Sequence, residues 1–173
     1  MDNVSEDQVF RYNEDVSVNT LDPIYIKSQS EIWIGSQIYE GLVALDSSLK
    51  PVPKIAKHWS ISDSGRVYKF VLKPNIFFSI PGGKQNDFRI TKRKVNSFDV
   101  GHSLYRLLDP KNTSPGSWII NDKMDFPDVS SISSEDYSLL YQDPQSPIFC
   151  PNDSVVIIRI KKAFPAFLSL LAT

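Results

Sequence analysis

The clearest structural signal in the chain is WSISDSGRVYKFVLK, residues 59–73. Two extended runs flank the turn sequence DSG, in which Gly65 can take the left-handed conformation that most residues avoid. In the second run Tyr68, Phe70 and Leu72 fall at alternate positions, so they share one face of a strand. The stretch predicts a β-hairpin with one aromatic face. Such a face more often belongs to a core than to a platform for stacked nucleic-acid bases.

A helix is expected before this hairpin. Ser28 and Glu31 have the spacing of a capping box, in which each side chain satisfies a backbone group of the other residue. Ile34 and Ile38 follow at helical spacing and predict an apolar stripe. The pattern predicts a helix over about residues 29–40, ended by the following glycine as a C-terminal cap.

A second helix is expected near the middle of the chain, with Asn96 as its cap and Asp99 in its first turn. It ends before Pro110, because proline disfavours helix in the preceding residue. Its expected buried stripe consists of Val100, Leu104, Leu107 and Leu108. A third helix begins at Pro165, an allowed position for proline in a first turn. The leucines of this helix that need cover are Leu168, Leu170 and Leu171.

The remaining segments are strands, turns and loops. Strands are expected at residues 8–12, 43–46, 137–142 and 155–161, after a loose polar tail at residues 1–7. A short helical turn is expected at residues 53–59. Residues 79–94 are expected to form a loop, because they contain Pro-Gly-Gly and five Lys or Arg residues. This mixture of helices and strands predicts an α+β (mixed α/β) fold.

The composition indicates a folded chain without a strong overall charge. Of the 173 residues, 41% are apolar and 23% are charged, and the formal net charge is −1. This balance gives no global attraction to nucleic acid or to an anionic membrane. No apolar run approaches the roughly 20 residues that span a bilayer. Cys150, the single cysteine, cannot form an internal disulfide or a multi-thiolate metal site.

The sequence contains no recognisable catalytic set. The two histidines, His58 and His102, accompany neither a GxSxG nor an HExxH motif. A metal at either histidine would need further ligands that the neighbouring sequence does not supply. We therefore expect no enzyme activity, no metal and no cofactor.

Two basic motifs suggest phosphate binding only superficially. The sequence PGGK at residues 81–84 lacks the spacing of a phosphate-binding loop and does not lead into a helix. The basic cluster of the chain comprises Arg89, Lys92, Arg93 and Lys94. It has no interleaved aromatic residues, so a solvated loop is expected rather than a nucleic-acid partner.

The order of the motifs along the chain is more specific than any one of them. The series is LDP at residues 21–23, YEGLV at 39–43, PxIAxxW at 53–59, SDSG with YxFxLK at 62–73, NxxDV at 96–100, SLxRLLDP at 103–110 and FPxFxxLL at 164–171. In this order and spacing, residues 9–171 resemble the N-terminal part of the bacterial extracellular solute-binding proteins of family 5. This is the dipeptide/oligopeptide class that serves ABC importers.

The resemblance implies part of a periplasmic-binding-protein-like fold with two lobes and an additional sheet-rich domain. Residues 8–42 would begin ligand-binding lobe I, residues 43–154 would form the additional domain, and residues 155–173 would return to lobe I. The second lobe and a signal sequence would lie outside this chain. The family's compact turn is replaced here by the long segment 79–95, and residues 119–153 match the family poorly.

The resemblance also implies capture of a ligand without chemistry. Two lobes would close over a di- or oligopeptide outside the cytoplasm, in the periplasm or as a membrane-anchored lipoprotein, and deliver it to permease subunits. The positions that match ligand contacts of relatives are Lys27, Ser28, Gln29 and Trp118. Without the second lobe, this chain would bind peptide weakly and would self-associate through its uncovered leucines.

Other functions stay open on the sequence. The same fold could hold a nickel complex, haem or an oligosaccharide. A similar module could also act as the sensor of a cytoplasmic transcription regulator, which predicts a helix-turn-helix upstream of Met1. The binding-protein interpretation predicts a signal peptide there instead. An enzyme is disfavoured, because it would need the catalytic set that is missing.

Overall fold

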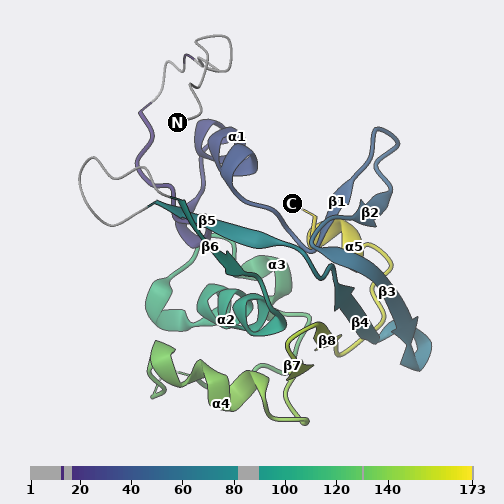
Figure 1. The fold of residues 1–173 in the computed structure, drawn as a ribbon. Coiled ribbons are helices and arrows are strands. Elements are labelled where there is room, and N and C mark those ends of the chain that lie inside the picture. The colour runs from purple at the N-terminus through teal and green to yellow at the C-terminus, as the bar shows by residue number, and fades with distance from the viewer. Residues whose placement is uncertain (1–12, 14–16, 82–89, 130, 173) are drawn as a thin grey trace.

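The computed structural model describes residues 13, 17–81, 90–129 and 131–172. The predicted tail and the predicted strand at residues 8–12 lie outside these ranges. The strands are β1 (Val43–Leu45), β2 (Pro51–Pro53), β3 (Ala56–Ser62), β4 (Val67–Leu72), β5 (Phe77–Pro81), β6 (Ile90–Lys94), β7 (Ile148–Asn152) and β8 (Val155–Arg159). The α-helices are α1 (Gln29–Ile38), α2 (Ser97–Leu108), α3 (Trp118–Asn121), α4 (Tyr137–Tyr141) and α5 (Phe167–Leu170). Short 3₁₀ helices are η2 (Pro23–Tyr25), η3 (Asp63–Gly65), η4 (Pro110–Asn112) and η5 (Ser134–Asp136). This mixture confirms the predicted fold class (Figure 1).

A four-stranded antiparallel sheet in the order β3-β4-β8-β7 lies at the centre of the fold. Phe70 of β4 stands opposite Trp59 of β3 and Val156 of β8. Helices α2 and α4 contact each other and both contact β7. Strand β8 confirms the strand predicted from residue 155, and it shares the sheet with β4. The predicted domain boundaries remain predictions.

The β3–β4 hairpin confirms the expectation from residues 59–73. Gly65 has φ +89°, and Asp63 and Ser64 in the same turn also have positive φ. The predicted aromatic face is buried and consists of Tyr68, Phe70 and Leu72. The hairpin therefore contributes a core face, as the alternation of its residues predicts.

Aromatic side chains fill much of the core. The fully buried ring of Tyr105 lies with its centroid 4.9 Å from that of Phe126 and 5.9 Å from that of Tyr137. Tyr105 shares a hydrogen bond with Ser146, and Tyr137 donates its hydroxyl to the Asp109 carboxylate. Burial raises the pKa of Tyr105 to about 12 and the pKa of Tyr137 far above its usual range. Both hydroxyls therefore keep their protons, and the buried polar atoms are paired.

Helix α2 has the predicted boundaries, but of the predicted buried stripe only Leu108 is buried. Asn96 accepts the N–H of Asp99 at 3.1 Å, and Asp99 accepts the N–H of Asn96 at 2.9 Å. The buried positions are Ser97, Gly101, Tyr105 and Leu108, whereas Val100, Leu104 and Leu107 are half-buried. A Cβ at Gly101 would lie 3.0 Å from Tyr141 and 3.1 Å from the Cys150 sulfur. The small residues therefore let α2 approach α4 and β7 closely, so the buried face runs through Ser97, Gly101 and Tyr105 rather than through Val100, Leu104 and Leu107.

Helix α1 ends earlier than predicted. Its last residue is Ile38, and Tyr39 is already extended, so Gly41 is not the C-terminal cap. A Cβ at Gly41 would lie 3.2 Å from the carbonyl oxygen of Val43 and 3.3 Å from that of Leu171. The glycine is required because β1 and the end of α5 approach the backbone here. The predicted extended segment at residues 43–46 is confirmed as β1.

The predicted helical turn at residues 53–59 is wrong. The backbone from Ala56 onward forms β3, with Ala56 opposite Leu72 and a register irregularity before His58. Pairing along β4 satisfies the backbone groups of this segment, which an isolated helical turn would leave largely to solvent. The irregularity disturbs the alternation that would have indicated a strand.

The predicted strand at residues 137–142 is also wrong, because Tyr137–Tyr141 form helix α4. Tyr137, Leu140 and Tyr141 lie at helical spacing and all pack into the core. These side chains meet α2, whose Tyr105 lies near both tyrosine rings. The packing decides in favour of a helix, since a strand would send neighbouring side chains to opposite faces.

The prediction of a loop at residues 79–94 is partly wrong. Its two ends are strands β5 and β6, which pair with each other, while residues 82–89 lie outside the described ranges. Both strands carry β-branched or aromatic residues that favour extended structure. The basic residues obscure this signal in the sequence, because runs of lysine and arginine are typical of solvated loops.

The apolar side chains at the C-terminal end of the chain are partly buried against the core. Phe167 is fully buried, with its ring centroid 4.8 Å from that of Tyr68. Leu168 and Leu171 are half-buried and pack against the core. The leucines are thus less exposed than the sequence suggests. Self-association stays a prediction.

Candidate functional site

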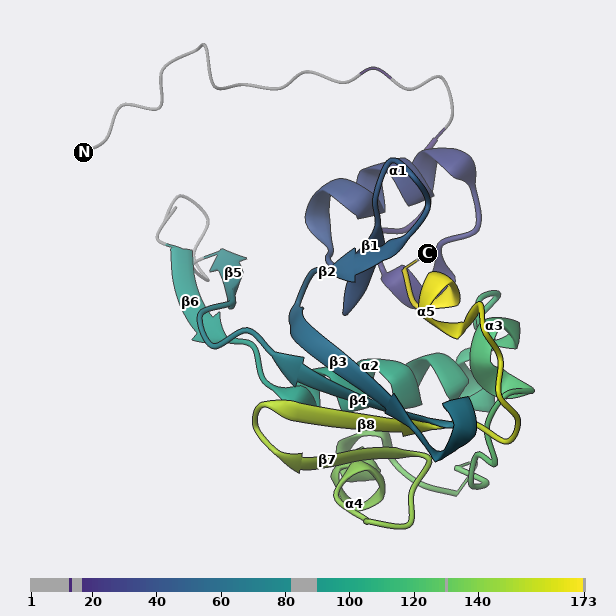
Figure 2. The ribbon, with the colours of Figure 1, turned by 90° about the vertical axis from the view of Figure 1, so that its right-hand side faces the viewer.

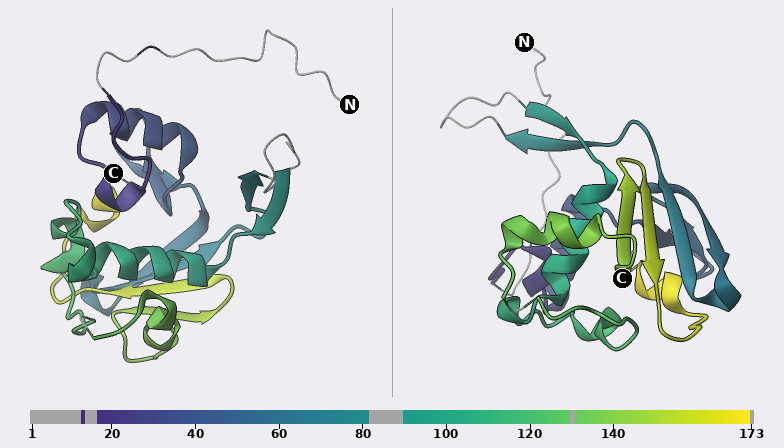
Figure 3. Two further views of the ribbon diagram at one scale, coloured as in Figure 1. Left: turned by 90° about the vertical axis from the view of Figure 1, so that its left-hand side faces the viewer. Right: turned by 90° about the horizontal axis from the view of Figure 1, so that it is seen from below.

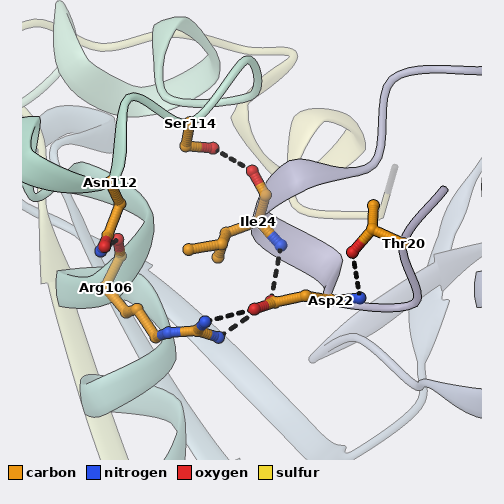
Figure 4. A network of polar contacts seen from close by, with 6 residues as sticks. All are labelled: Thr20, Asp22, Ile24, Arg106, Asn112 and Ser114. Carbon is orange, nitrogen blue, oxygen red and sulfur yellow. Dashed lines mark hydrogen bonds and ion pairs between the residues drawn. The ribbon is translucent and has the colours of Figure 1, made fainter.

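A bidentate ion pair ties the segment before α1 to the C-terminal part of α2 (Figure 4). Arg106 donates Nη1 to Oδ1 of Asp22 at 2.9 Å and Nη2 to Oδ2. The same carboxylate caps η2 by accepting the N–H of Ile24 at 3.4 Å. Hydrogen bonds from Arg106 hold the pKa of Asp22 below its usual value. The pair therefore stays charged at neutral pH and fixes the direction in which the chain enters α1.

A second contact ties the same segment to the loop after α2. The buried Ser114 hydroxyl donates to the carbonyl of Ile24 at 2.5 Å. The side-chain amide of Asn112 donates to the carbonyl of Arg106 at 2.7 Å. The loop that leads to Trp118 is therefore held in a fixed position relative to the segment before α1.

A buried carboxylate holds the backbone at the start of α1. The side chain of Glu31, 1% exposed, accepts three backbone N–H groups, from Asn19 at 3.1 Å, Lys27 at 3.2 Å and Ser28 at 3.2 Å. The hydrogen bonds from Lys27 and Ser28 lower the pKa of Glu31 to about 2 from an ordinary 4.5. Because the folded-state pKa is lowered, this stabilisation is complete above about pH 4.5 and is lost as the pH falls toward 2.

The predicted ligand-binding residues lie on these two anchored segments. Lys27 and Gln29 are exposed, and Ser28 is half-buried as the N-cap of α1, accepting the N–H of Glu31 at 3.2 Å. Trp118 begins α3 and is 68% exposed. Residues 27–29 are consecutive at the start of α1, and the Ser114–Ile24 hydrogen bond joins the segment before them to the loop before Trp118.

Large apolar side chains are exposed around α1. They are Leu21, Tyr25, Ile32, Trp33, Ile38 and Tyr39, each 38–53% exposed, and we call them the α1 surface. Ile38 belongs to the apolar stripe that the sequence predicts. Helical periodicity indicates an apolar face but does not say whether this chain covers it, so the sequence did not identify the exposed surface. Exposed apolar groups of this extent are typical of surfaces that bind something.

A cavity of about 440 Å³ lies between the end of α2 and the segment after α3, and Trp118 is not among its lining residues. Ser117 and Asn121, on either side of Trp118 in the sequence, contribute to its lining, together with Asp109 and Phe126. The lining combines hydroxyl, amide and carboxylate groups with an aromatic wall. Such a mixture suits polar organic ligands rather than a bare ion.

Within the described ranges, no group of three or more His, Cys, Asp and Glu side chains is placed to hold a metal ion. His58 lies on β3 and His102 on α2, and both are exposed. The ring centroid of His102 lies 5.6 Å from that of Tyr137. For the same ranges, no helix has the length and apolar character needed to cross a membrane.

We expect Arg106→Ala to loosen the segment before α1. The substitution removes both hydrogen bonds to Asp22, and the side chains of the pair are about a third exposed, so solvent screening limits the loss of unfolding free energy to about 1 kcal/mol. Amide hydrogen exchange of Ile24 should accelerate. Thermal unfolding and exchange measured by mass spectrometry test this.

The control is Lys54→Ala, which removes a single ion pair to Glu40 at 3.0 Å with both side chains about half exposed. Its effect should stay below about 0.5 kcal/mol and leave Ile24 unchanged. Equal effects of the two substitutions would contradict a special role for Arg106. Arg106→Lys should restore part of the loss, because lysine keeps the charge but not the paired geometry.

The comparisons with known proteins agree on one family. A family profile described as bacterial extracellular solute-binding proteins, family 5 Middle, matches residues 50–173. The probable deoxycholate-binding periplasmic protein YgiS of Escherichia coli (strain K12) is 31% identical over 108 residues, covering 62% of this chain and 18% of that protein. The peptide transport periplasmic protein SapA of Salmonella typhimurium is 27% identical over 137 residues, covering 75% of this chain and 24% of that protein.

The fold agrees with the same assignment. The substrate-binding domain of an oligopeptide ABC transporter from Bacillus anthracis str. Ames superimposes with a TM-score of 0.67 at 23% identity, covering 88% of this chain and 26% of that chain. The chain spans only about a fifth to a quarter of the length of these relatives. Because the profile covers most of the chain, the protein belongs to the bacterial extracellular solute-binding proteins of family 5.

Proposed function

We propose that the protein captures di- or oligopeptides outside the cytoplasm and delivers them to the permease of an ABC importer. The observation that carries the proposal is its membership of family 5 over residues 50–173. Relatives named for peptide transport or peptide binding include SapA of Salmonella typhimurium and a di/tripeptide-binding protein of Pseudomonas aeruginosa. In this role the protein binds and releases its ligand without converting it chemically.

The proposed ligand contacts are Lys27, Ser28, Gln29 and Trp118. Lys27 presents an ammonium group to a peptide carboxylate, and Gln29 presents an amide to the peptide backbone. Ser28 accepts the N–H of Glu31 and caps α1, so its proposed contribution is to hold the backbone of this segment in place for the ligand. Trp118 offers an exposed ring for apolar packing.

The local geometry supports this assignment of roles. The backbone of Lys27 and Ser28 is held by the Glu31 carboxylate, and the Trp118 loop is held through Ser114. Contacts built on such a fixed backbone need little ordering when a ligand binds, which favours affinity. The α1 surface beside them can supply further apolar contact once the rest of the protein closes over the ligand.

Native mass spectrometry of the intact protein, purified without denaturation, tests the proposal. We expect a ladder of small added masses that match short peptides and disappear after unfolding and refolding. Added synthetic di- and tripeptides should then restore the bound masses.

Other cargo would give a different spectrum. One discrete added mass, such as a bile acid, a metal complex or a sugar, would keep the family and overturn the peptide assignment. Failure of both retained and added peptides to bind would contradict peptide capture. A parent gene that encodes a helix-turn-helix before Met1 would favour a regulatory role instead.

A further inference from the structure

The cavity between the end of α2 and the segment after α3 lies at one end of the molecule. Figures 2 and 3 show α3 and the segment that follows it beyond the C-terminal end of α2, away from the β5–β6 hairpin. The cavity volume of about 440 Å³ falls within the range of about 300–1,000 Å³ that is usual for pockets that hold small organic ligands. None of the proposed peptide contacts lines it, so the proposed site leaves this space unused.

The described residues that line the cavity carry only negative charge. They include two aspartates, Asp109 and Asp128, and no lysine, arginine or histidine. Asp128 is exposed, whereas Asp109 is only 4% exposed. A ligand in this cavity therefore meets carboxylates and no positively charged side chain of the wall.

Asp109 is a buried carboxylate that forms no ion pair within the described part of the chain. Its oxygens accept the backbone N–H of Lys111 at 2.9 Å and the hydroxyl of Tyr137. Both partners are neutral groups. Buried charges are usually paired with an opposite charge, because the removal of an unpaired charge from water is costly.

The basic residues close to Asp109 in the sequence are engaged elsewhere. Arg106, one turn earlier on α2, donates both of its terminal nitrogens to Asp22. The ammonium of Lys111 donates to the carbonyl of Ile132 at 2.9 Å. The negative charge of Asp109 therefore lacks a counter-ion from its own segment.

The structural contacts of Asp109 do not require a charge. The residue caps η4 by accepting the N–H of Lys111, and asparagine caps helices about as well as aspartate. An amide oxygen could also accept the hydroxyl of Tyr137. The charge thus exceeds what the local fold needs, and the residue that carries it lines a cavity.

Other groups of the wall are suited to an organic cation. Among the described residues, the side chains of Ser117 and Asn121 form no hydrogen bond with the protein, so their oxygens can accept one from a ligand. The half-buried ring of Phe126 adds an aromatic wall, a surface that attracts cations. Leu108 and Val129 offer apolar contact to an alkyl stem.

We propose that this cavity binds an organic ammonium group, with Asp109 as the counter-ion. An ammonium group has three N–H donors and needs several acceptors, which the carboxylate, hydroxyl and amide groups supply. The group can belong to a free amine or to a lysine side chain of a captured peptide, because both place the same cation on an alkyl stem. The inference does not rest on the proposed function, since binding of a free amine requires no peptide.

Calorimetric titration of the intact protein with n-butylammonium chloride tests the inference. This cation has the alkyl stem and the charge of a lysine side chain, and n-butanol serves as the uncharged probe of similar shape. We expect n-butylammonium to bind at least about tenfold more tightly than n-butanol. Asp109→Asn should weaken binding of the amine about tenfold to a hundredfold, because it removes a hydrogen bond between charged groups, and should leave n-butanol unaffected.

Two further variants separate the charge of the wall from a general effect of substitution. Asp128→Asn changes an exposed residue of the lining, so it should weaken amine binding by only about threefold. The matched control is Asp125→Asn, an exposed residue outside the lining, and it should leave the affinity unchanged. Equal binding of amine and alcohol, or equal losses in Asp109→Asn and Asp125→Asn, would overturn the inference. If Asp109→Asn does not fold, Asp128→Asn decides, and an unchanged affinity there overturns it.

Two tripeptides identify the source of the ammonium group. Ala-Lys-Ala and Ala-norleucine-Ala differ only in the ammonium at the end of the central side chain. A cargo lysine in the cavity predicts that Asp109→Asn weakens binding of Ala-Lys-Ala alone. A free amine predicts that both tripeptides keep their affinity in Asp109→Asn and in saturating n-butylammonium.

The same titrations keep this inference separate from the proposed function. Amine binding that depends on Asp109, without binding of any peptide, would contradict the proposed function and support the ammonium site. Peptide binding without any amine binding would give the reverse result and overturn the ammonium site.

Discussion

Replacing Phe70 by alanine should lower the free energy of unfolding by about 3–5 kcal/mol. Phe70 is fully buried on β4, an inner strand of the central sheet, and its ring centroid lies 6.4 Å from that of Trp59. The substitution removes the transfer free energy of the ring and leaves a cavity that the paired strands cannot close. Since domains are typically stable by only about 5–15 kcal/mol, this loss is severe. Urea unfolding followed by circular dichroism measures it.

Two variants separate cavity formation from a general effect of substitution. Phe70→Leu should cost clearly less, because it keeps most of the buried volume. Leu139→Ala changes a side chain that is 72% exposed on α4 and should stay within about 0.5 kcal/mol. A Phe70→Ala protein as stable as the Leu139→Ala protein would show that the sheet face is not a packed core.

Replacing Trp118 by alanine should weaken peptide binding about thirtyfold to a hundredfold, or about 2–3 kcal/mol. Tryptophan side chains that become buried by a ligand often dominate binding energy. Trp118 is 68% exposed before binding, so its removal costs the free protein little. Isothermal titration of the intact protein with a peptide that it binds measures the affinity. Thermal unfolding of the same variants measures the stability.

The two measurements must diverge for Trp118 to be a ligand contact. Stability should change by less than about 0.5 kcal/mol while affinity falls. Trp118→Phe should recover part of the affinity, because the smaller ring still packs against the ligand. Unchanged affinity in Trp118→Ala would remove this residue from the proposed site. Ile61→Ala, an exposed position on β3, controls for general loss of apolar surface.

Local sequence chemistry predicted the elements whose causes are local. The capping boxes at Ser28 and Asn96 confirm this, because cap and partner lie within one helical turn. The turn at Gly65 and the buried face that carries Phe70 follow in the same way from turn chemistry and strand alternation. Such patterns need no knowledge of distant residues.

Elements decided by distant contacts were less predictable. Helix α4 and the first half of β3 depend on packing against α2 and pairing with β4. In the candidate site, the Asp22–Arg106 pair and the Ser114–Ile24 hydrogen bond join residues 84 and 90 positions apart. A single sequence contains no signal for such pairs, so their contribution to the site could be found only in the folded chain.

The strand order also sets a delay between the synthesis of β4 and the synthesis of its partner β8. β4 ends at Leu72, but its partner β8 begins only at Val155, so residues 73–154 must be made before the two strands can pair. At about 5–20 residues per second, a ribosome needs about 4–16 seconds for that stretch. During this time β4 can pair only with β3. Phe167, which packs against Tyr68 in the folded chain, has not yet been made. The nascent chain therefore exposes the apolar side chains of β4 for seconds. This time is long enough for a chaperone to bind them before the sheet is complete.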